Sequence, residues 1–299
     1  MDERELEFKF NKAVELEQEG KYLHAIQLYS SLLNTEHYRR DSVMQLHKIY
    51  EKMGNIPYSS TTLKRHLESF PDDFEMRKYY SLFLIKHALY EDAVDQLSHL
   101  GTDEIPEVKF LTGLARFYMK DYEPAVINFT DFIAGNNPSD YVYDAYLYSA
   151  KANLELERID KAMEAARGAE KIFANNEELQ LLLTKIYLLK GLNLHAFESV
   201  SKGLRLNNES RQMNELAGRI SFELGEYEKA ENHLKKILSE PEQNDEIYTL
   251  LGLIYMKKGE YASAVEMLER AIELNPGNIH AAENKKICFE QLDNKNISQ

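Results

Sequence analysis

The sequence predicts an all-α fold in which eight helix-turn-helix repeats stack in a row and one further helix caps the last of them. Three observations predict this fold class. Residue types recur every 34 residues, apolar positions lie three and four apart within each recurrence, and only 13 glycines and 7 prolines interrupt 299 residues. A composition of 43% hydrophobic and 29% charged residues supplies both a packed core and a solvated surface.

The repeat is clearest at 245–278 and can be followed back through the chain. One period upstream, residues of the same kind occupy the equivalent positions: Gly218, Gly225, Tyr227, Ala230 and Leu234 correspond to Gly252, Gly259, Tyr261, Ala264 and Leu268. The frame predicts eight repeats, of which the third is two residues short and the fourth three residues long. Their ranges are 6–39, 40–73, 74–105, 106–142, 143–176, 177–210, 211–244 and 245–278.

Small residues at two positions of the repeat predict that its two helices lie close together. The twentieth position reads Ala25, Ser59, Ala93, Ala125, Ala162, Ala196, Ala230 and Ala264. The eighth position reads Ala13, His47, Ser81, Gly113, Ala150, Thr184, Gly218 and Gly252. Small side chains let the two helix backbones approach, and neighbouring repeats then bury each other's apolar faces. His47 is the exception, and two interpretations stay open: a polar network with Ser59 and His66, or a locally loosened hairpin.

The connections follow from the same frame. Lys258-Gly259-Glu260 predicts a tight turn within the last repeat, because glycine tolerates left-handed backbone geometry. The segment 134–142 is predicted to be a longer loop or a hinge. After the repeats, 279–292 predicts a capping helix over the last apolar face, and 293–299 predicts a polar tail.

The last repeat resembles the tetratricopeptide repeat family. The residues that carry the resemblance are Tyr248, Leu251, Gly252, Tyr255, Ala264, Leu268, Ala271 and Pro276. The resemblance extends over all eight repeats and implies that they wind into a right-handed superhelical solenoid. It also implies that the first helices of successive repeats line a concave groove, which takes extended peptides or partner helices.

No pattern in the sequence indicates catalysis, a cofactor or a metal ion. No two histidines lie three or four residues apart, and neither a glycine-rich phosphate loop nor a Gly-x-Ser-x-Gly elbow occurs. The single cysteine, Cys288, excludes an internal disulfide and a multi-cysteine metal site. The sequence therefore predicts a protein that is not an enzyme and that needs neither cofactor nor metal.

Charge and hydropathy limit the classes of partner. A formal net charge of −14 disfavours nucleic acid and anionic membranes, which both bind basic surfaces. No segment approaches the roughly 18 apolar residues of a membrane-spanning helix, and the acidic start of the chain lacks the apolar segment of a secretory signal. We therefore expect a cytoplasmic protein with neither a membrane nor a nucleic-acid partner, and the sequence leaves its oligomeric state open.

The groove that the resemblance implies points to the residues that would contact a partner. Aromatic residues are favoured anchors because they bury a large area at a low entropy cost. The aromatic residues at groove positions of the middle repeats are Tyr79, Phe110, Phe117, Tyr118 and Tyr148. The cations at the ninth position of four repeats are Lys48, Lys151, Lys185 and Arg219. Together they predict a protein or peptide partner that is acidic and carries apolar anchors.

We therefore interpret the chain as a non-catalytic scaffold or adaptor for protein–protein interaction. Two alternatives stay open. One is a co-chaperone-like protein that grips peptide termini, but the groove asparagines and lysines of such proteins are interrupted here, since Val14 follows Asn11 and Gln45 stands in the next repeat. The other is an RNA-associated α-solenoid, which the acidic net charge and the leucine-rich groove disfavour.

Overall fold

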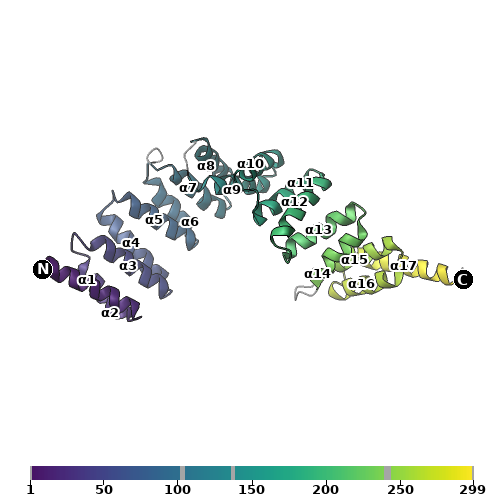
Figure 1. Cartoon of the computed structure of the whole chain (residues 1–299), viewed down its shortest axis with the longest axis horizontal. Coiled ribbons are helices and arrows are strands. Elements are labelled where there is room, and N and C mark those ends of the chain that lie inside the picture. Colours follow the sequence, from purple (N-terminus) through teal and green to yellow (C-terminus); the bar gives the residue numbers. More distant parts are fainter. Residues whose placement is uncertain (1, 102–104, 136–138, 239–243, 298–299) are drawn as a thin grey trace. The chain divides into compact units, whose positions relative to one another are not determined.

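The computed structural model describes residues 2–101, 105–135, 139–238 and 244–297, and every regular element in these ranges is a helix. The helices form eight antiparallel pairs followed by a final helix (Figure 1). Their bounds are α1 Glu3–Gln18, α2 Tyr22–Leu32, α3 Arg39–Lys52, α4 Ile56–Ser69, α5 Phe74–Lys86, α6 Tyr90–Ser98, α7 Glu107–Tyr118, α8 Tyr122–Ala134, α9 Val142–Glu155, α10 Ile159–Ile172, α11 Glu177–Leu189, α12 Asn193–Leu206, α13 Arg211–Glu223, α14 Tyr227–Leu238, α15 Asp245–Lys258, α16 Tyr261–Leu274 and α17 Ile279–Ile297. The predicted all-α fold of paired helices is confirmed.

The chain divides into two compact units, Met1–Tyr148 and Ser149–Gln299. Within the first unit each helix packs on the next one along the chain, and α5 also contacts α7. Within the second unit the same order holds from α10 to α17, and α13 contacts α15. First helices of adjacent repeats therefore lie side by side inside each unit, which brings their exposed side chains onto a common surface.

All eight pairs turn through a residue with left-handed backbone geometry. At the fifteenth position of the repeat, φ is 74° at Gly20, 72° at Gly54, 69° at Gly191, 76° at Gly225 and 77° at Gly259. The other three repeats adopt the same geometry without glycine, with φ of 58° at Ala88, 63° at Lys120 and 57° at Glu157. A side chain in this region costs about 1–2 kcal/mol, so three turns carry backbone strain.

Exchanging alanine and glycine at these turns should change stability in opposite directions. We expect Ala88→Gly to stabilise the α5–α6 pair by about 0.5–1 kcal/mol, because relief of strain exceeds the added chain entropy of glycine. Gly54→Ala should destabilise the α3–α4 pair by about 1 kcal/mol. A Cβ at Gly54 would meet no atom within 4 Å, so the loss would come from the backbone alone. Amide hydrogen exchange of each pair measures both effects, and changes of the same sign would contradict this account.

The small residues between paired helices are all buried, as their role in close packing requires. Every residue at the twentieth position is 0% exposed, including Ser59 and Ala264. At the eighth position a Cβ added to Gly252 would lie 2.6 Å from Leu268, and one added to Gly218 would lie 2.6 Å from Leu234. Side chains already occupy the space where these Cβ atoms would lie, so glycine is required for the observed helix separation.

The final helix, α17, covers the apolar face of the last repeat. Its Ala281 and Cys288 are fully buried in a cluster with Tyr248, Ala264 and Leu268. The helix continues to Ile297, so residues 293–297 extend it beyond the predicted end at 292. Residues 298–299 of the predicted tail lie outside the described residues, as do residues 136–138 of the segment expected to be a loop or a hinge.

A carboxylate with three donors links two adjacent repeats of the second unit. Glu231 of α14 accepts hydrogen bonds from the Tyr255 hydroxyl at 3.0 Å and from Lys258 Nζ at 2.7 Å, both on α15. Lys235 Nζ lies 2.6 Å from the same carboxylate. Burial alone would raise the pKa of Glu231, but the hydrogen bonds from Lys235, Lys258 and Tyr255 outweigh it and hold the pKa at about 2.

This cluster makes stability depend on pH in a defined direction. Because the pKa of Glu231 is lower in the folded than in the unfolded chain, its contribution is present above the unfolded value near 4.5 and is lost as the pH falls towards 2. We expect Glu231→Gln to destabilise α14–α15 by about 1 kcal/mol at pH 7. The difference from wild type should shrink below pH 4. Melting curves across this range measure it, with Glu228→Gln as the exposed control on the same helix, and a difference independent of pH would contradict it.

Candidate partner-binding surface

Four aromatic residues of the first compact unit form one cluster, which we call the aromatic patch: Tyr90, Phe117, Tyr118 and Tyr148. The rings of Tyr90 and Tyr118 stack with centroids 5.4 Å apart and planes 12° apart. Phe117 and Tyr148 meet edge to face at 5.2 Å, and the hydroxyl oxygens of Tyr118 and Tyr148 lie 2.9 Å apart. The patch joins the start of α6, the last turn of α7 and the middle of α9.

The repeat frame explains why these rings meet. The seventeenth position of one repeat lies next to the thirteenth position of the following repeat, and here both are tyrosine, Tyr90 and Tyr118. The seven other repeats carry Gln18, Lys52, Lys86, Glu155, Leu189, Glu223 and Lys257 at the thirteenth position. The stacked pair therefore occurs where the third repeat meets the fourth.

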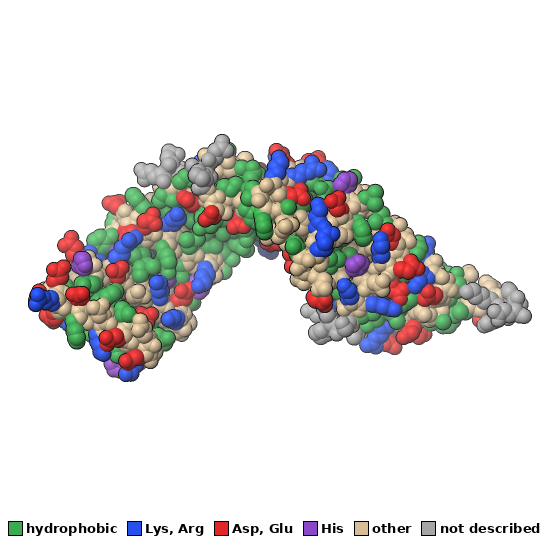
Figure 2. Space-filling model, in the orientation of Figure 1, with side chains coloured by type: hydrophobic (Ala, Val, Ile, Leu, Met, Phe, Trp, Pro, Cys, Tyr) green, Lys and Arg blue, Asp and Glu red, His purple; other side chains and the backbone are tan. Residues whose placement is uncertain are grey.

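The patch combines exposure with fixed geometry. Tyr118 is 43% exposed, while Tyr90, Phe117 and Tyr148 are partly buried. Figure 2 shows hydrophobic side chains gathered on the surface of the first unit towards its C-terminal helices. Aromatic rings that are already ordered by neighbours lose little conformational entropy when a ligand covers them. The arrangement suits the anchoring of apolar side chains from another molecule.

Tyr79 lies outside the patch and is tied to a buried histidine. The Ser59 hydroxyl donates to the His47 carbonyl at 2.9 Å, so it accepts from His47 Nδ1–H at 2.8 Å. His47 Nε2 then accepts from the Tyr79 hydroxyl at 3.2 Å. Burial lowers the pKa of the His47 imidazole, which keeps the ring neutral at neutral pH.

This hydrogen-bonded chain decides between the two interpretations of His47. His47 and Ser59 form a polar network, but its third member is Tyr79. His66, the expected third member, instead places Nε2 2.9 Å from the Asp73 carboxylate. The hairpin is therefore not loosened at His47, because both ring nitrogens are satisfied in a fully buried position.

Phe110, expected on the groove surface, lies in the core. It is 3% exposed, and its ring stacks on Tyr141 with centroids 4.7 Å apart and planes 14° apart. Phe132 packs against it at 5.7 Å. Tyr141 belongs to the three additional residues of the long fourth repeat, and this extension covers a position that the repeat frame alone leaves open. Phe110 is therefore omitted from the candidate surface.

The four cations predicted at the ninth position of the repeat, which we call the basic stripe, differ in their surroundings. Lys151 pairs with Glu178 at 2.5 Å, and Arg219 pairs with Glu215 at 3.1 Å and Glu246 at 2.7 Å. Across the part of the chain that the structure describes, Lys48 and Lys185 have no ion pair, and both are exposed. An incoming carboxylate would therefore have to compete with protein carboxylates at Lys151 and Arg219, and it would meet no such competition at Lys48 or Lys185.

Sequence reasoning did not single out Tyr90, although the repeat carries a signal for it. The seventeenth position is tyrosine in five repeats, at Tyr22, Tyr90, Tyr122, Tyr227 and Tyr261. Comparing this position with the thirteenth position of the next repeat identifies Tyr90 and Tyr118 as the one aromatic match. Comparing the ninth position of one repeat with the second position of the next identifies two ion pairs in the same way, Lys151–Glu178 and Arg219–Glu246.

Other kinds of site find no support among the described residues. No group of three or more histidine, cysteine, aspartate or glutamate side chains there is arranged to hold a metal ion. The thiol of Cys288 is buried, which raises its pKa and disfavours the reactive thiolate. None of the described helices combines the length and apolar character needed to cross a bilayer.

Comparison with known proteins relates the chain to other helical repeats. The family profile of the tetratricopeptide repeat matches residues 221–285. BBSome complex member BBS4 of Bos taurus is 23% identical over 198 residues, which cover 66% of this chain and 37% of that protein. TPR repeat-containing protein MJ1428 of Methanocaldococcus jannaschii is 30% identical over 162 residues, which cover 53% of this chain and 27% of that protein. The chain thus spans about a third of the length of these relatives.

A solved structure shows the same arrangement of helices. The crystal structure of YrrB, described as a TPR protein with an unusual peptide-binding site, aligns with a TM-score of 0.57 at 16% identity. The alignment covers 62% of this chain and 95% of YrrB. At this level of identity the likeness concerns the fold, which is a row of paired helices.

Proposed function

Because the chain is a tetratricopeptide repeat protein, we propose that it is a non-catalytic scaffold that binds a partner protein through the aromatic patch. Tetratricopeptide repeat proteins generally mediate protein–protein interactions and are typically non-catalytic. The observation that carries the proposal is the stacked and hydrogen-bonded set of Tyr90, Phe117, Tyr118 and Tyr148, with Tyr118 43% exposed.

The chemistry of the patch indicates what kind of partner segment it would take. Rings arranged edge to face and stacked present both apolar faces and hydroxyl groups, so they suit one or two large apolar side chains flanked by polar backbone. An extended segment or one face of a helix provides such side chains at regular spacing. We therefore propose a partner peptide or helix with one or two apolar anchors.

Acidic residues in the partner are the second part of the proposal. Lys48 and Lys185 are exposed cations without an ion pair among the described residues, so they are available to steer a negatively charged segment. Lys151 and Arg219 would have to exchange a protein carboxylate for a carboxylate of the partner. Exposed charges of this kind affect the rate of association more than the final affinity.

Affinity capture with paired baits tests the proposal. The wild-type chain and the double variant Tyr118→Ala/Tyr148→Ala are used to capture proteins from the same extract, and each enriched protein is then tested as a purified partner. The control bait, Phe8→Ala/Phe289→Ala, removes two exposed aromatic residues from α1 and α17, which are 69% and 46% exposed. A direct partner retained by the control and lost by the patch variant supports the proposal. Equal retention by both variants contradicts it.

A further inference from the structure

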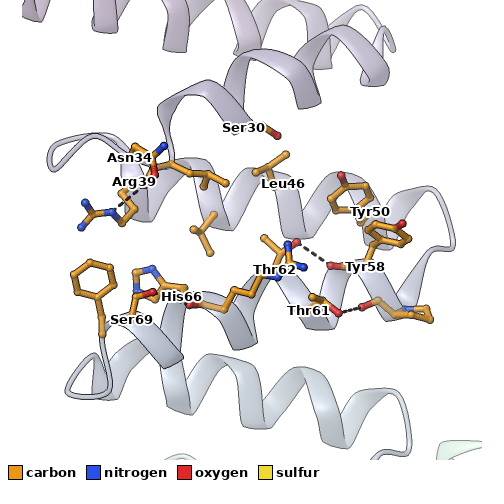
Figure 3. A pocket seen from close by; sticks show the side chains of 15 residues that line it. Ser30, Asn34, Arg39, Leu46, Tyr50, Tyr58, Thr61, Thr62, His66 and Ser69 are labelled. Carbon is orange, nitrogen blue, oxygen red and sulfur yellow. Dashed lines mark hydrogen bonds between the residues drawn. The ribbon is translucent and has the colours of Figure 1, made fainter. Parts of the chain in front are cut away.

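A cavity of about 690 Å³ opens in the first compact unit between the end of α2, the buried side of α3 and the exposed side of α4 (Figure 3). A volume of this size matches the sites that bind small molecules in proteins. Its lining shares no residue with the aromatic patch or with the predicted basic stripe. The cavity is therefore a separate feature that the proposed function does not use.

The two ends of the cavity differ in chemical character. Figure 3 shows Arg39, His66 and Ser69 at one end and Tyr50 with Tyr58 at the other. The rings of Tyr50 and Tyr58 pack with centroids 5.5 Å apart and form an aromatic wall. A molecule that fills the cavity lengthwise would thus place a polar group against cationic and hydroxyl side chains, and an apolar body against the two tyrosines.

The charge of the lining has one sign. Two arginines, Arg39 and Arg65, line the cavity and no aspartate or glutamate does, although the chain carries a net charge of −14. Arg39 is held in place, because its Nε donates to the Leu33 carbonyl at 3.0 Å and its guanidinium lies 4.4 Å from the centre of the Phe70 ring. The Arg65 guanidinium makes no hydrogen bond or ion pair with any residue that the structure describes.

His66 supplies a buried polar atom without a partner. Its Nε2 bonds the Asp73 carboxylate at 2.9 Å, and its Nδ1 has no hydrogen bond among the described residues. The residue is only 8% exposed. Because the Asp73 carboxylate accepts from Nε2–H, Nδ1 of the neutral ring is an acceptor, and a ligand that donates a hydrogen bond to it removes the cost of leaving it unpaired. Asp73 fixes the ring orientation, so Nδ1 occupies a defined position at the end of the cavity that holds Arg39.

We propose that this cavity binds a small organic anion, with a phosphate or carboxylate head group held by the two arginines of the lining, Arg39 and Arg65, and an aromatic or apolar body against Tyr50 and Tyr58. Arginine recognises both head groups through paired N–H donors. The hydroxyls of Ser69 and Thr62 already donate to the Arg65 and Tyr58 carbonyls, so they and His66 Nδ1 offer acceptor atoms to a hydroxyl group or a protonated phosphate oxygen of the ligand. The body lies against Leu46 and the tyrosine wall.

Titration calorimetry with four probes tests the proposal on the full chain. Phenyl phosphate and benzoate carry the two head groups on an aromatic body, phenol carries the body alone, and inorganic phosphate carries the head alone. We expect at least one aromatic anion to bind at least about tenfold more tightly than phenol and than inorganic phosphate, since both ends of the cavity contribute. The tighter of the two identifies the preferred head group.

Two variants locate the binding. Arg65→Gln should lower the affinity for the preferred aromatic anion by about tenfold. Lys64 is an exposed neighbour outside the lining, so Lys64→Gln should change this affinity by less than about twofold. Tyr58→Ala should weaken the aromatic anions and leave the response to inorganic phosphate unchanged. Arg65 and Tyr58 are exposed, so their replacement leaves the core intact.

Three results would overturn the proposal. Phenol binding as tightly as both aromatic anions would show that the head-group end contributes nothing, and equal affinities of Arg65→Gln and wild type would show that binding occurs elsewhere. Inorganic phosphate binding as tightly as phenyl phosphate would indicate an adventitious ion only. The Tyr118→Ala/Tyr148→Ala variant should bind the probes as wild type does, so failure of this proposal and failure of the aromatic patch are distinguishable.

Discussion

Replacing Ala264 with leucine is expected to destabilise the C-terminal repeat by about 1–3 kcal/mol. Ala264 is fully buried, and its carbonyl oxygen would lie 3.4 Å from a Cβ added to Gly252 on the facing helix. The larger leucine side chain would push α16 away from α15, which separates Leu268 from the glycine that it packs against. The effect is large because Leu268 and the Ala264 backbone already lie within 3.4 Å of where a Cβ on the facing helix would be.

Glu266→Leu is the matched control. It introduces the same side chain two residues along the same helix, at an exposed position. Its effect should stay within about 0.5 kcal/mol, as is usual for a surface substitution. Thermal melting of both variants, combined with hydrogen exchange of α15 and α16, measures the difference. Equal stability of the two variants would mean that the assignment of close-packed positions within the repeat is wrong.

Loss of two tyrosines from the aromatic patch is expected to have the largest effect on binding. We expect Tyr118→Ala/Tyr148→Ala to reduce the binding free energy of a direct partner by about 2 kcal/mol or more, which raises the dissociation constant about 30-fold. Tyr118 supplies the exposed ring, and the 2.9 Å contact between the two hydroxyl groups holds both rings in place. A few buried aromatic anchors usually dominate an interface, so the loss should appear as faster dissociation.

The cations should act on a different kinetic step. Lys48→Gln and Lys185→Gln should slow association and reduce its dependence on salt, with little change in dissociation. Surface plasmon resonance at two ionic strengths separates the two effects. A partner that binds the folded tyrosine variant with unchanged affinity would exclude the aromatic patch as its main contact.

Much of the fold could be predicted because each repeat applies the same local rules. A left-handed turn needs a residue at the fifteenth position that tolerates positive φ, and a close helix pair needs small residues at the eighth and twentieth. These requirements produce a recurring pattern of residue types at a fixed spacing in the sequence, as at Gly252, Gly259 and Ala264. The sequence did not reveal that Ala88, Lys120 and Glu157 adopt the same turn, because their types carry no signal for it.

The candidate site was harder to predict, because burial and pairing depend on the neighbouring repeat. Phe110 occupies a groove position in the frame, yet Tyr141 covers it from the end of its own long repeat. The sequence offers Lys151 a possible partner within its own helix, Glu155, but the structure pairs it with Glu178 of the next repeat. The position of a residue within its repeat predicts which face of the helix it lies on. Whether that residue is exposed also depends on the residues of the adjoining segments.

The cavity beside α4 left no signal that a motif search recognises. Arg39, Arg65 and His66 come from two helices and lie at positions with different roles in the repeat. His66 stands where other repeats place apolar or small residues, and among these three residues it is the one visible departure from the repeat pattern. Its meaning depends on the unpaired Nδ1, which only the three-dimensional arrangement shows.

The three turns without glycine are consecutive along the chain, at Ala88, Lys120 and Glu157. Solenoids ordinarily fray from their ends, because a terminal repeat has one neighbour instead of two. Here three interior repeats each lose about 1–2 kcal/mol of stability to backbone strain at the turn. A protease or an unfoldase that captures transiently opened segments would find its entry points in the middle of this chain as well as at its ends.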